Sequence, residues 1–420
     1  MRALQHNSEV KETGQLRRAG CLVPPIPVLC CAATVRANRG TGTEHAQSNE
    51  RDNREVHMKT IIAGTALAIA ALAASQLALA QNSRTLDITW IDVEGGAATL
   101  LVAPSGESML VDTGYAVGDR DAKRISAATQ KAGLRKIDHL VISHFHGDHM
   151  GGLAALAKMI PIERFYDHGG TVDAVDQGRL DEYKAVAGGK RTIVKPGDEI
   201  AMAGVKTLVV SSNKALLASP VPGGGANALC SDAPLMSAAG GENQRMVGVL
   251  HSYGNFRFLN LIDLDWQMEM ELACPINKLG TVTLYQTSRH GSLDGAGAPA
   301  FLGAIRPQLV VVNNGPRKGL GQTDTRIQPV TIAGKPAAPY EKNSYLRLAK
   351  LPGIEGIWQG HLSLLDNNPA HNTTPDMVAN VEDTADCQGH EITAKVAADG
   401  KVTVTNGRNG FSKSYMARGN

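Results

Sequence analysis

Three histidines and one aspartate lie close together in the segment Ser143-His144-Phe145-His146-Gly147-Asp148-His149. Imidazole nitrogens and carboxylate oxygens are ligands that Zn²⁺ and similar divalent cations take from proteins. Because His144 and His146 alternate, their side chains can point to the same side, and Asp148 and His149 follow on the turn. The spacing therefore predicts a loop that serves two adjacent metal ions. A solvated polar loop is the alternative that this density of ligands disfavours.

The elements on either side of this segment are predicted to hold it at the edge of a sheet. An apolar strand over 137–142 comes directly before it, and an apolar helix over 150–159 comes directly after it. Further strands are predicted over 86–93, 98–103, 108–112, 162–166, 205–210, 246–250, 255–262, 282–286 and 309–312, and helices over 119–131, 180–187, 265–272, 299–305 and 340–350. No Gly-x-Gly-x-x-Gly follows the first strand, so the pattern favours sheets covered by helices and not a dinucleotide-binding unit.

The histidine-rich loop resembles the HxHxDH signature of the metallo-β-lactamase superfamily. Three further segments resemble the rest of that pattern in the same order: Leu-Val-Asp-Thr-Gly at 110–114, Phe-Leu-Asn-Leu-Ile-Asp at 258–263 and Arg-His-Gly-Ser at 289–292. The resemblance implies six metal ligands, namely His144, His146, Asp148, His149, Asp263 and His290. It also implies that Asp112 supports the metal loop from behind, and that the fold is a four-layer αββα sandwich of the α/β (α+β) class.

The region around the predicted bridging ligand departs from the family pattern. Ile262 stands where the family usually has Gly, and Asp265 is close enough to be the alternative to Asp263. Arg289 replaces the first His of the family's His-His-Gly-Ser motif, which leaves His290 as the candidate for the last ligand. If the first His of that motif were the true ligand, the site would lack a donor and Arg289 would repel the metal.

The resemblance also implies a third histidine for the metal ion that His144, His146 and Asp263 would bind, and this histidine is missing. Many family members carry a His after the strand equivalent to 205–210, but here that strand runs into Ser211-Ser212-Asn213. His168, which ends a strand near the metal loop, is either a substitute ligand or a surface or supporting residue. His361, Arg317 and Lys318 are further candidates for the pocket, and the two cations could bind an anionic group of the substrate.

Two further segments of the sequence resemble one subgroup of the superfamily. Residues 91–98 and 309–315 resemble segments of the hydrolase domain of the natural-competence DNA-uptake protein, whose membrane channel is absent here. This resemblance covers about residues 86–320. A predicted hairpin around Asp399-Gly400 adds a small C-terminal extension, so we expect a metallo-β-lactamase-fold domain over 81–385 and a hairpin over 386–420 that packs on it.

The N-terminal part of the chain has the pattern of an export signal. Met58-Lys59-Thr60 precedes an apolar run that ends in Ala78-Leu79-Ala80, which predicts a signal peptide over 58–80 and a mature chain from Gln81. Residues 1–57 are predicted to be a disordered, non-native extension. The expected location is the periplasm or the exterior of a bacterium, with no membrane span in the mature chain. Export permits one disulfide among Cys230, Cys274 and Cys387, and the pairing stays open.

Composition limits the function classes. The chain has 420 residues, an apolar fraction of 43% and a net charge of +2, which excludes a disordered chain and a multi-span membrane protein. The mature chain is near neutral, so we expect no stable nucleic-acid complex. The expected partner is a small-molecule or phosphodiester substrate. The oligomeric state stays open. The Gly- and Ala-rich stretch 211–241 is either a lid or a disordered segment.

The function that the resemblance implies is an exported metallohydrolase. Two Zn²⁺ ions are expected, with Mn or Fe as alternatives, and a metal-bound hydroxide would attack an ester, amide or phosphodiester bond. Asp148 is the predicted catalytic residue because it can orient the nucleophile. β-Lactams or lactones are alternative substrates. A non-catalytic exported binding protein that has kept the fold is the alternative from another class.

Overall fold

The computed structural model describes residues 85–419 except 232, 237–239, 293–294, 323–328, 331–338 and 385. All of these residues belong to the second of the chain's two units, 71–420. The predicted extension 1–57 and signal peptide 58–80 therefore lie outside the described residues. Within the described part of the chain, no helix is both long enough and apolar enough to span a membrane.

The first of two large sheets has nine strands and contains the strand before the metal loop. In spatial order its strands are β22 (Ser412–Met416), β21 (Lys401–Asn406), β20 (Ile392–Val396), β1 (Leu86–Trp90), β2 (Thr99–Val102), β3 (Ser108–Val111), β4 (His139–Val141), β5 (Phe165–Asp167) and β6 (Arg191–Ile193). The strands from β22 to β3 pair antiparallel, and those from β3 to β6 pair parallel. The carboxyl ends of β3, β4 and β5 therefore meet at one edge.

The second sheet carries the strands that precede the other predicted ligands. Its main path is β19 (Val378–Asn380), β18 (Gly356–His361), β16 (Leu309–Val312), β15 (Leu284–Gln286), β13 (Phe256–Asn260), β12 (Gly248–Tyr253), β8 (Val205–Ser212) and β7 (Glu199–Met202), with β9 (Ala215–Leu216) beside β8. The strands from β13 to β19 pair parallel. Strands β15 and β16 are buried along their whole length, as parallel strands with both faces covered should be.

The two sheets pack face to face around one apolar core, and helices cover their outer faces. Trp90 of the first sheet contacts Phe258 of the second, with ring centroids 5.6 Å apart. Gln286 lies between the sheets, where its side-chain oxygen accepts hydrogen bonds from Trp90 (2.9 Å) and Thr99 (3.0 Å). A second apolar cluster lies outside the first sheet and includes Ile125 and other buried residues of the covering helices.

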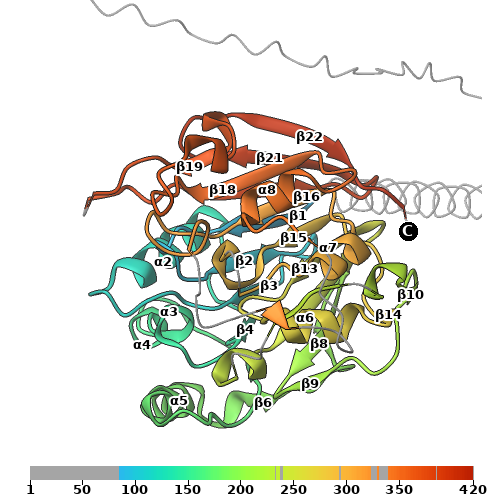
Figure 1. Cartoon of the computed structure of the whole chain (residues 1–420). Coiled ribbons are helices and arrows are strands. Elements are labelled where there is room, and N and C mark those ends of the chain that lie inside the picture. Colours follow the sequence, from blue (N-terminus) through green and yellow to red (C-terminus); the bar gives the residue numbers. More distant parts are fainter. Residues whose placement is uncertain are drawn as a thin grey trace, which may run out of the picture. The chain divides into compact units, whose positions relative to one another are not determined.

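Six helices form most of the two outer layers. Those over the first sheet are α2 (Arg120–Lys131), α4 (Leu153–Leu156) and α5 (Ala174–Ala187); those over the second are α6 (Trp266–Ala273), α7 (Pro299–Ile305) and α8 (Ser344–Ala349) (Figure 1). The order helix, sheet, sheet, helix confirms the predicted αββα sandwich.

The C-terminal segment forms three strands, one more than the sequence predicts. β20 pairs with β1, so that Ile88 lies opposite Ala394, and β21 and β22 continue the first sheet beyond it. β22 escaped prediction because its sequence, Ser-Lys-Ser-Tyr-Met, is mostly polar, and Tyr415 is its one buried side chain. The extension is therefore part of the sheet that also positions the metal loop.

The stretch after β8 is tied to the second helical layer. It contains β10 (Gly225–Ala226), which pairs with β14 (Ile276–Asn277), and a disulfide joins Cys230 to Cys274 just after α6. Cys387 carries a free thiol and is half-buried. The sequence left this pairing open, because three distant cysteines have no spacing that selects two of them.

Candidate metal centre

The predicted metal loop follows β4 and enters the short helix α3 (Gly147–Met150) at the edge of the first sheet. Two glycines after it allow the chain to pack tightly on the loop after β3. A Cβ atom on Gly151 would lie 2.5 Å from the backbone nitrogen of Ala116, and one on Gly152 would lie 2.2 Å from the carbonyl oxygen of Thr113. These contacts are closer than any side chain permits, so the glycines hold the metal loop against the 112–116 segment.

Four predicted ligands converge in one group: Asp148, His149, Asp263 and His290. Each offers one ligand atom, and these atoms lie within 4.8 Å of one another. Nε2 of His149 is 3.2 Å from Oδ2 of Asp148 and 3.5 Å from Oδ2 of Asp263. Nε2 of His290 is 3.2 Å from Oδ1 of Asp263 and 3.4 Å from Oδ2 of Asp148. We call these residues the four-donor group.

A second group shares one member with the first. His144, His146 and Asp263 also bring ligand atoms within 4.8 Å of one another, and we call them the three-donor group. Nε2 of His144 and Nδ1 of His146 are 2.9 Å apart. Asp263 thus lies between two clusters of nitrogen and oxygen donors. The structure brings all six predicted ligands together in this arrangement.

Three polar atoms at the middle of the four-donor group form no hydrogen bond within the described part of the chain. Nε2 of His149, Oδ1 of Asp263 and Nε2 of His290 are buried and form no hydrogen bond among the described residues. Leaving a buried polar group unpaired is costly. A divalent cation bound by these atoms would remove that cost, so the donor set and its burial both fit a metal ion.

The electrostatics of the group favour the same conclusion. Burial opposes ionisation of Asp263, yet His290 and His149 hold the pKa of its carboxyl well below its usual range. Burial also opposes a charge on His149, but the carboxylates around it raise the pKa of its imidazole well above the usual value. Burial, followed by the nearby His149, holds the pKa of His144 well below its usual value. The carboxylates around His149 therefore attract positive charge, which a cation bound by the group would supply, and the lowered pKa of His144 favours its neutral ring.

Asp112 orders the loop from behind. Its carboxylate accepts hydrogen bonds from the backbone nitrogen and the hydroxyl of Ser143, both at 2.7 Å, and lies 2.8 Å from Nδ1 of His149. Because the Ser143 hydroxyl donates to Asp112, it can accept from Nδ1 of His144, 3.0 Å away. Both histidines then carry their proton on Nδ1, which leaves Nε2 as the ligand atom.

The turn after β13 separates the two aspartates that the sequence left as alternatives. Asp263 faces the donor groups, whereas Asp265 caps α6 by accepting from the backbone nitrogen of Met268 (3.0 Å). Ile262, at the position where the family usually has Gly, has a φ of 47°. Left-handed backbone costs a β-branched residue roughly 1–2 kcal/mol, and here it turns the chain so that Asp263 points at the centre.

His290 lies on a turn, Ser288–Gly291, that is anchored to the turn of Asp263. The backbone nitrogen of Arg289 donates to the carbonyl oxygen of Ile262 at 2.7 Å. The side chain of Arg289 packs beside Gly295, where an added Cβ would lie 2.6 Å from Nε. Nδ1 of His290 is 3.1 Å from the side-chain nitrogen of Asn313. Asn313 therefore helps to set the orientation of the His290 ring.

His168 contacts the metal loop indirectly. Its Nε2 lies 2.9 Å from Oε1 of Glu242, and the same oxygen accepts from the backbone nitrogen of Phe145 at 3.1 Å. His168 is in neither donor group. At the end of β8, where the family's additional His would follow, Ser211 accepts a hydrogen bond from the backbone nitrogen of Gly248 (2.9 Å). These contacts hold the loop but add no third imidazole to the three-donor group.

The two neighbouring cations Arg317 and Lys318 point to different partners. Arg317 pairs with Asp383 at 2.6 Å and is largely exposed. Nζ of Lys318 contacts Oδ2 of Asp148 and lies 2.9 Å from the hydroxyl of Tyr115. The structure therefore places Lys318 at the centre and Arg317 outside it.

His361 belongs to a separate buried pair. Its Nε2 is 2.7 Å from Oδ1 of Asp92, whose other oxygen accepts from Arg124 at 2.9 Å. Cys387 lies close enough to complete a group of three potential ligands with this pair. Arg124 already supplies the positive charge that Asp92 needs, which makes the pair a link between β1 and β18.

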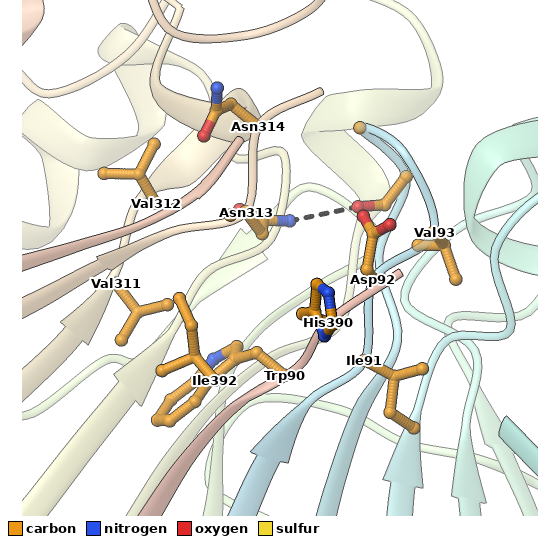
Figure 2. A pocket seen from close by; sticks show the side chains of 13 residues that line it. Trp90, Ile91, Asp92, Val93, Val311, Val312, Asn313, Asn314, His390 and Ile392 are labelled. Carbon is orange, nitrogen blue, oxygen red and sulfur yellow. Dashed lines mark hydrogen bonds between the residues drawn. The ribbon is translucent and has the colours of Figure 1, made fainter. Parts of the chain in front are cut away.

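A small cavity lies between the sheets beside the centre, and Figure 2 shows the side chains around it. Its volume is about 20 Å³, which is room for one water molecule. Asn313 is part of its wall and donates to the carbonyl oxygen of Gly96 at 3.3 Å. This cavity cannot hold a substrate. Among the donors, His146 has a side chain that is 34% exposed.

The sequence did not single out several residues that contact the predicted ligands. Tyr115 directly follows the Asp-Thr-Gly segment, and Asn313 follows a late strand that the sequence did identify, so both had a local signal. Glu242 and Asp176 had none. Nε2 of His146 is 3.7 Å from the carboxylate of Asp176, which lies on α5 and becomes a neighbour of the metal loop only in the folded chain.

A comparison with known families agrees with this fold. A profile of the metallo-beta-lactamase superfamily matches residues 91–234, which include the metal loop. The chain has the α/β sandwich fold of that superfamily.

Individual proteins resemble the chain over limited lengths or at low identity. An atrochrysone carboxyl ACP thioesterase of Cryptosporiopsis sp. (strain 8999) is 35% identical over 75 residues, which are 17% of this chain and 23% of that protein. The chain thus matches less than a quarter of this relative.

Two solved structures are similar to parts of the chain. The metallo-beta-lactamase fold protein YhfI from Bacillus subtilis is 11% identical with a TM-score of 0.38, over 65% of this chain and 95% of YhfI. CmlA, a diiron beta-hydroxylase from Streptomyces venezuelae, is 15% identical with a TM-score of 0.33, over 54% of this chain and 44% of CmlA.

Proposed function

We propose that the protein is an exported metal-dependent hydrolase. The observation that carries the proposal is the convergence of six histidine and aspartate side chains into two groups that share Asp263. His149, Asp263 and His290 are at most 7% exposed, and a buried cluster of this composition has little use other than binding a cation.

The residues divide into ligands and supports. His144, His146 and Asp263 would hold one ion, and Asp148, His149, Asp263 and His290 would hold the other. Two such ions, Zn²⁺ or alternatively Mn or Fe, supply a nucleophilic water of lowered pKa and a Lewis acid. Asp112 fixes the ring of His149, and Asn313 orients the ring of His290.

The electrostatics around Asp148 support its proposed catalytic role. Burial opposes its ionisation, yet His149, His290 and Lys318 hold the pKa of its carboxyl well below its usual range. An ionised carboxylate at the edge of the cluster accepts hydrogen bonds, and so can orient an attacking water molecule.

Several classes of scissile bond fit the proposed hydrolase. The resemblance to the competence-protein domain favours a phosphodiester, and the 75-residue match to a thioesterase adds thioesters. β-Lactams and lactones are the alternative substrates. A non-catalytic exported binding protein is the alternative from another class, which the absent third His and Arg289 favour.

Export rests on two observations in different parts of the chain. The pattern at 58–80 is that of a signal peptide. The Cys230–Cys274 disulfide suits a protein that works in an oxidising compartment. N-terminal sequencing of the native protein should find Gln81 at the start. A native protein that begins upstream of Met58 would contradict both the signal peptide and the non-native extension.

The test of the hydrolase uses metal content and turnover together. We expect about two divalent ions per chain by inductively coupled plasma mass spectrometry. Asp148→Ala should lower turnover of every substrate found by at least about 10³-fold with the fold intact by circular dichroism. Asp181→Ala is the matched control, because Asp181 is an exposed aspartate on α5. A chain that takes up no metal would favour the binding protein instead.

A further inference from the structure

We infer that Lys318 and Tyr115 form a binding subsite for an oxyanion that the substrate carries beside the scissile bond. The inference rests on the proposed hydrolase and names its substrate class. An oxyanion here means a carboxylate or a phosphoryl oxygen. Neutral esters, neutral thioesters and neutral lactones would then be poor substrates.

The turn that carries Lys318 is fixed at both of its sides. The backbone nitrogen of Gly315 donates to the carbonyl oxygen of Lys318 at 3.0 Å. A Cβ on Gly95 would lie 2.9 Å from the nitrogen of Gly315, and one on Gly319 would lie 2.2 Å from the carbonyl oxygen of His290. Both glycines have positive φ, of 90° and 87°. The turn is therefore wedged between the loop after β1 and the turn of His290, so the position of Lys318 is set by the backbone.

Tyr115 approaches the same point from the first sheet. Its hydroxyl lies 2.9 Å from Nζ of Lys318, and that nitrogen lies 5.2 Å from the centre of its ring. Gly96 packs against the ring, because an added Cβ would lie 3.2 Å from its Cε2 atom. An ammonium group and a phenol from opposite sheets thus meet next to Asp148.

The ammonium group has capacity for another partner. It has three donors, and its partners among the described residues are Asp148 and Tyr115. In the proposed enzyme Asp148 would also bind a cation, which would weaken its ion pair with Lys318. The side chain of Lys318 is 34% exposed, so a substrate can reach it. A positive donor beside the ligands attracts the negatively charged part of a substrate and aligns the adjacent bond.

The neighbouring Arg317 shows that a positive charge in this turn does not by itself place a side chain at the centre. Arg317 has the same charge and lies one residue away, but it pairs with Asp383 and its side chain is 70% exposed. The chain therefore directs one of two adjacent cations to the surface and the other to the centre. Arg317→Gln removes a charge of the same sign from the same turn, which makes it the matched control for Lys318→Gln.

The experiment compares anionic and neutral substrates in the full-length metal-loaded protein. The probes are bis(para-nitrophenyl) phosphate, the para-nitrophenyl monoester of glutaric acid, and neutral para-nitrophenyl acetate. Lys318→Gln should lower kcat/KM by about 10- to 100-fold for the anionic probe that is cleaved, the cost of a lost charge-assisted hydrogen bond. The neutral probe should change less than about threefold, and Lys318→Arg should restore part of the loss. The two anionic probes tell a phosphoryl group from a carboxylate.

A binding measurement separates this inference from the proposed function. Inorganic phosphate, titrated calorimetrically, should bind the wild type and Arg317→Gln equally, and Lys318→Gln at least about tenfold more weakly. Metal content should be the same in all three proteins. If none of the probes is cleaved, the phosphate titration still tests the subsite, and metal content and turnover of other substrates still test the hydrolase. Equal phosphate affinity, equal losses on neutral and anionic probes, or loss of metal in Lys318→Gln would each overturn the inference.

Discussion

The two donor groups differ in the number of their donor side chains, in burial and in what supports each donor. The four-donor group has two aspartates and two histidines, and its His149 and His290 are held by Asp112 and Asn313. The three-donor group has one aspartate and two histidines, and it includes His146, whose side chain is 34% exposed. Affinity rises with the number and the alignment of ligands. We therefore expect the four-donor position to fill first and the three-donor position to exchange its ion readily.

The largest effect should come from removing a ligand of the four-donor group. We expect His290→Ala to weaken the tighter site by more than about 100-fold, because loss of a mere supporting contact already costs 10- to 100-fold. His146→Ala should spare that site and abolish the weaker one. Competition with a chromogenic chelator measures both affinities. The comparison fails if His146→Ala weakens the tighter site as much as His290→Ala does.

His251 is a buried histidine far from the centre, and it contrasts with His149 because no carboxylate among the described residues offsets the effect of burial on its pKa. Burial lowers the pKa of His251 to about 3. Above pH 6.5 the ring of His251 is neutral in the folded and in the unfolded protein. As the pH falls toward 3, this ring takes up a proton only in the unfolded chain, so the folded state loses stability. From pH 7 to pH 4, His251→Gln should lose about 3 kcal/mol less unfolding free energy than the wild type. Urea unfolding at both pH values measures this difference.

The buried Glu269 has the opposite effect on the pH dependence of stability. The contribution of His251 must therefore be isolated with the His251→Gln variant. Burial raises the pKa of Glu269 to about 7. Between pH 4.5 and pH 7 the folded state therefore holds the extra proton, and stability from this group rises as the pH falls. The wild-type curve mixes both contributions. Identical curves for wild type and His251→Gln would show that His251 does not stay neutral in the folded protein.

A smaller effect is expected from the support behind His149. Asp112→Asn keeps the shape of the side chain but replaces the carboxylate beside Nδ1 with an amide, which removes its negative charge. The affinity of the four-donor site should fall by about 10- to 100-fold, with that of the three-donor site changed less. Metal titration of the variant tests this. Equal losses at both sites would mean that Asp112 holds the whole loop and not one ring.

The smallest effect should come from the support behind His146. Its Nε2 is 3.7 Å from the carboxylate of Asp176, which also pairs with Arg179. We expect Asp176→Asn to weaken the three-donor site by about fivefold and to leave the other site unchanged. Asp181→Asn on the exposed face of the same helix is the control. Nitrogen NMR of the histidine rings would show whether the protonated nitrogen of His146 changes.

The sequence predicted which donor side chains lie close together, but it did not predict the contacts that orient them. The spacing of the metal loop and two later motifs pointed to six side chains, which the structure brings together. That they bind metal stays a prediction. The choice between Asp263 and Asp265 needed the left-handed backbone of Ile262, because both follow the same strand. Likewise, the turn at Gly315 decides which of Arg317 and Lys318 reaches the centre.

Other features depended on contacts between distant parts of the chain. The Cys230–Cys274 pairing requires the stretch after β8 to lie beside the end of α6. Asp176 reaches His146 only once α5 has packed over the first sheet. β22 is polar because it lies at the sheet's edge, which removes the apolar alternation by which strands are recognised. Local sequence has no signal for such neighbours.

The pairing of β1 with β20 has a consequence for how the chain acquires its fold. Leu86 lies opposite Val396, so the first strand finds its partner roughly 300 residues later in the chain. Until the last strands are available, β1 is an unprotected edge that invites pairing with other molecules. Completion of the first sheet therefore waits for the whole polypeptide. If the chain is exported, as proposed above, this delay favours a chain that stays incompletely folded until its C-terminal strands have also been exported.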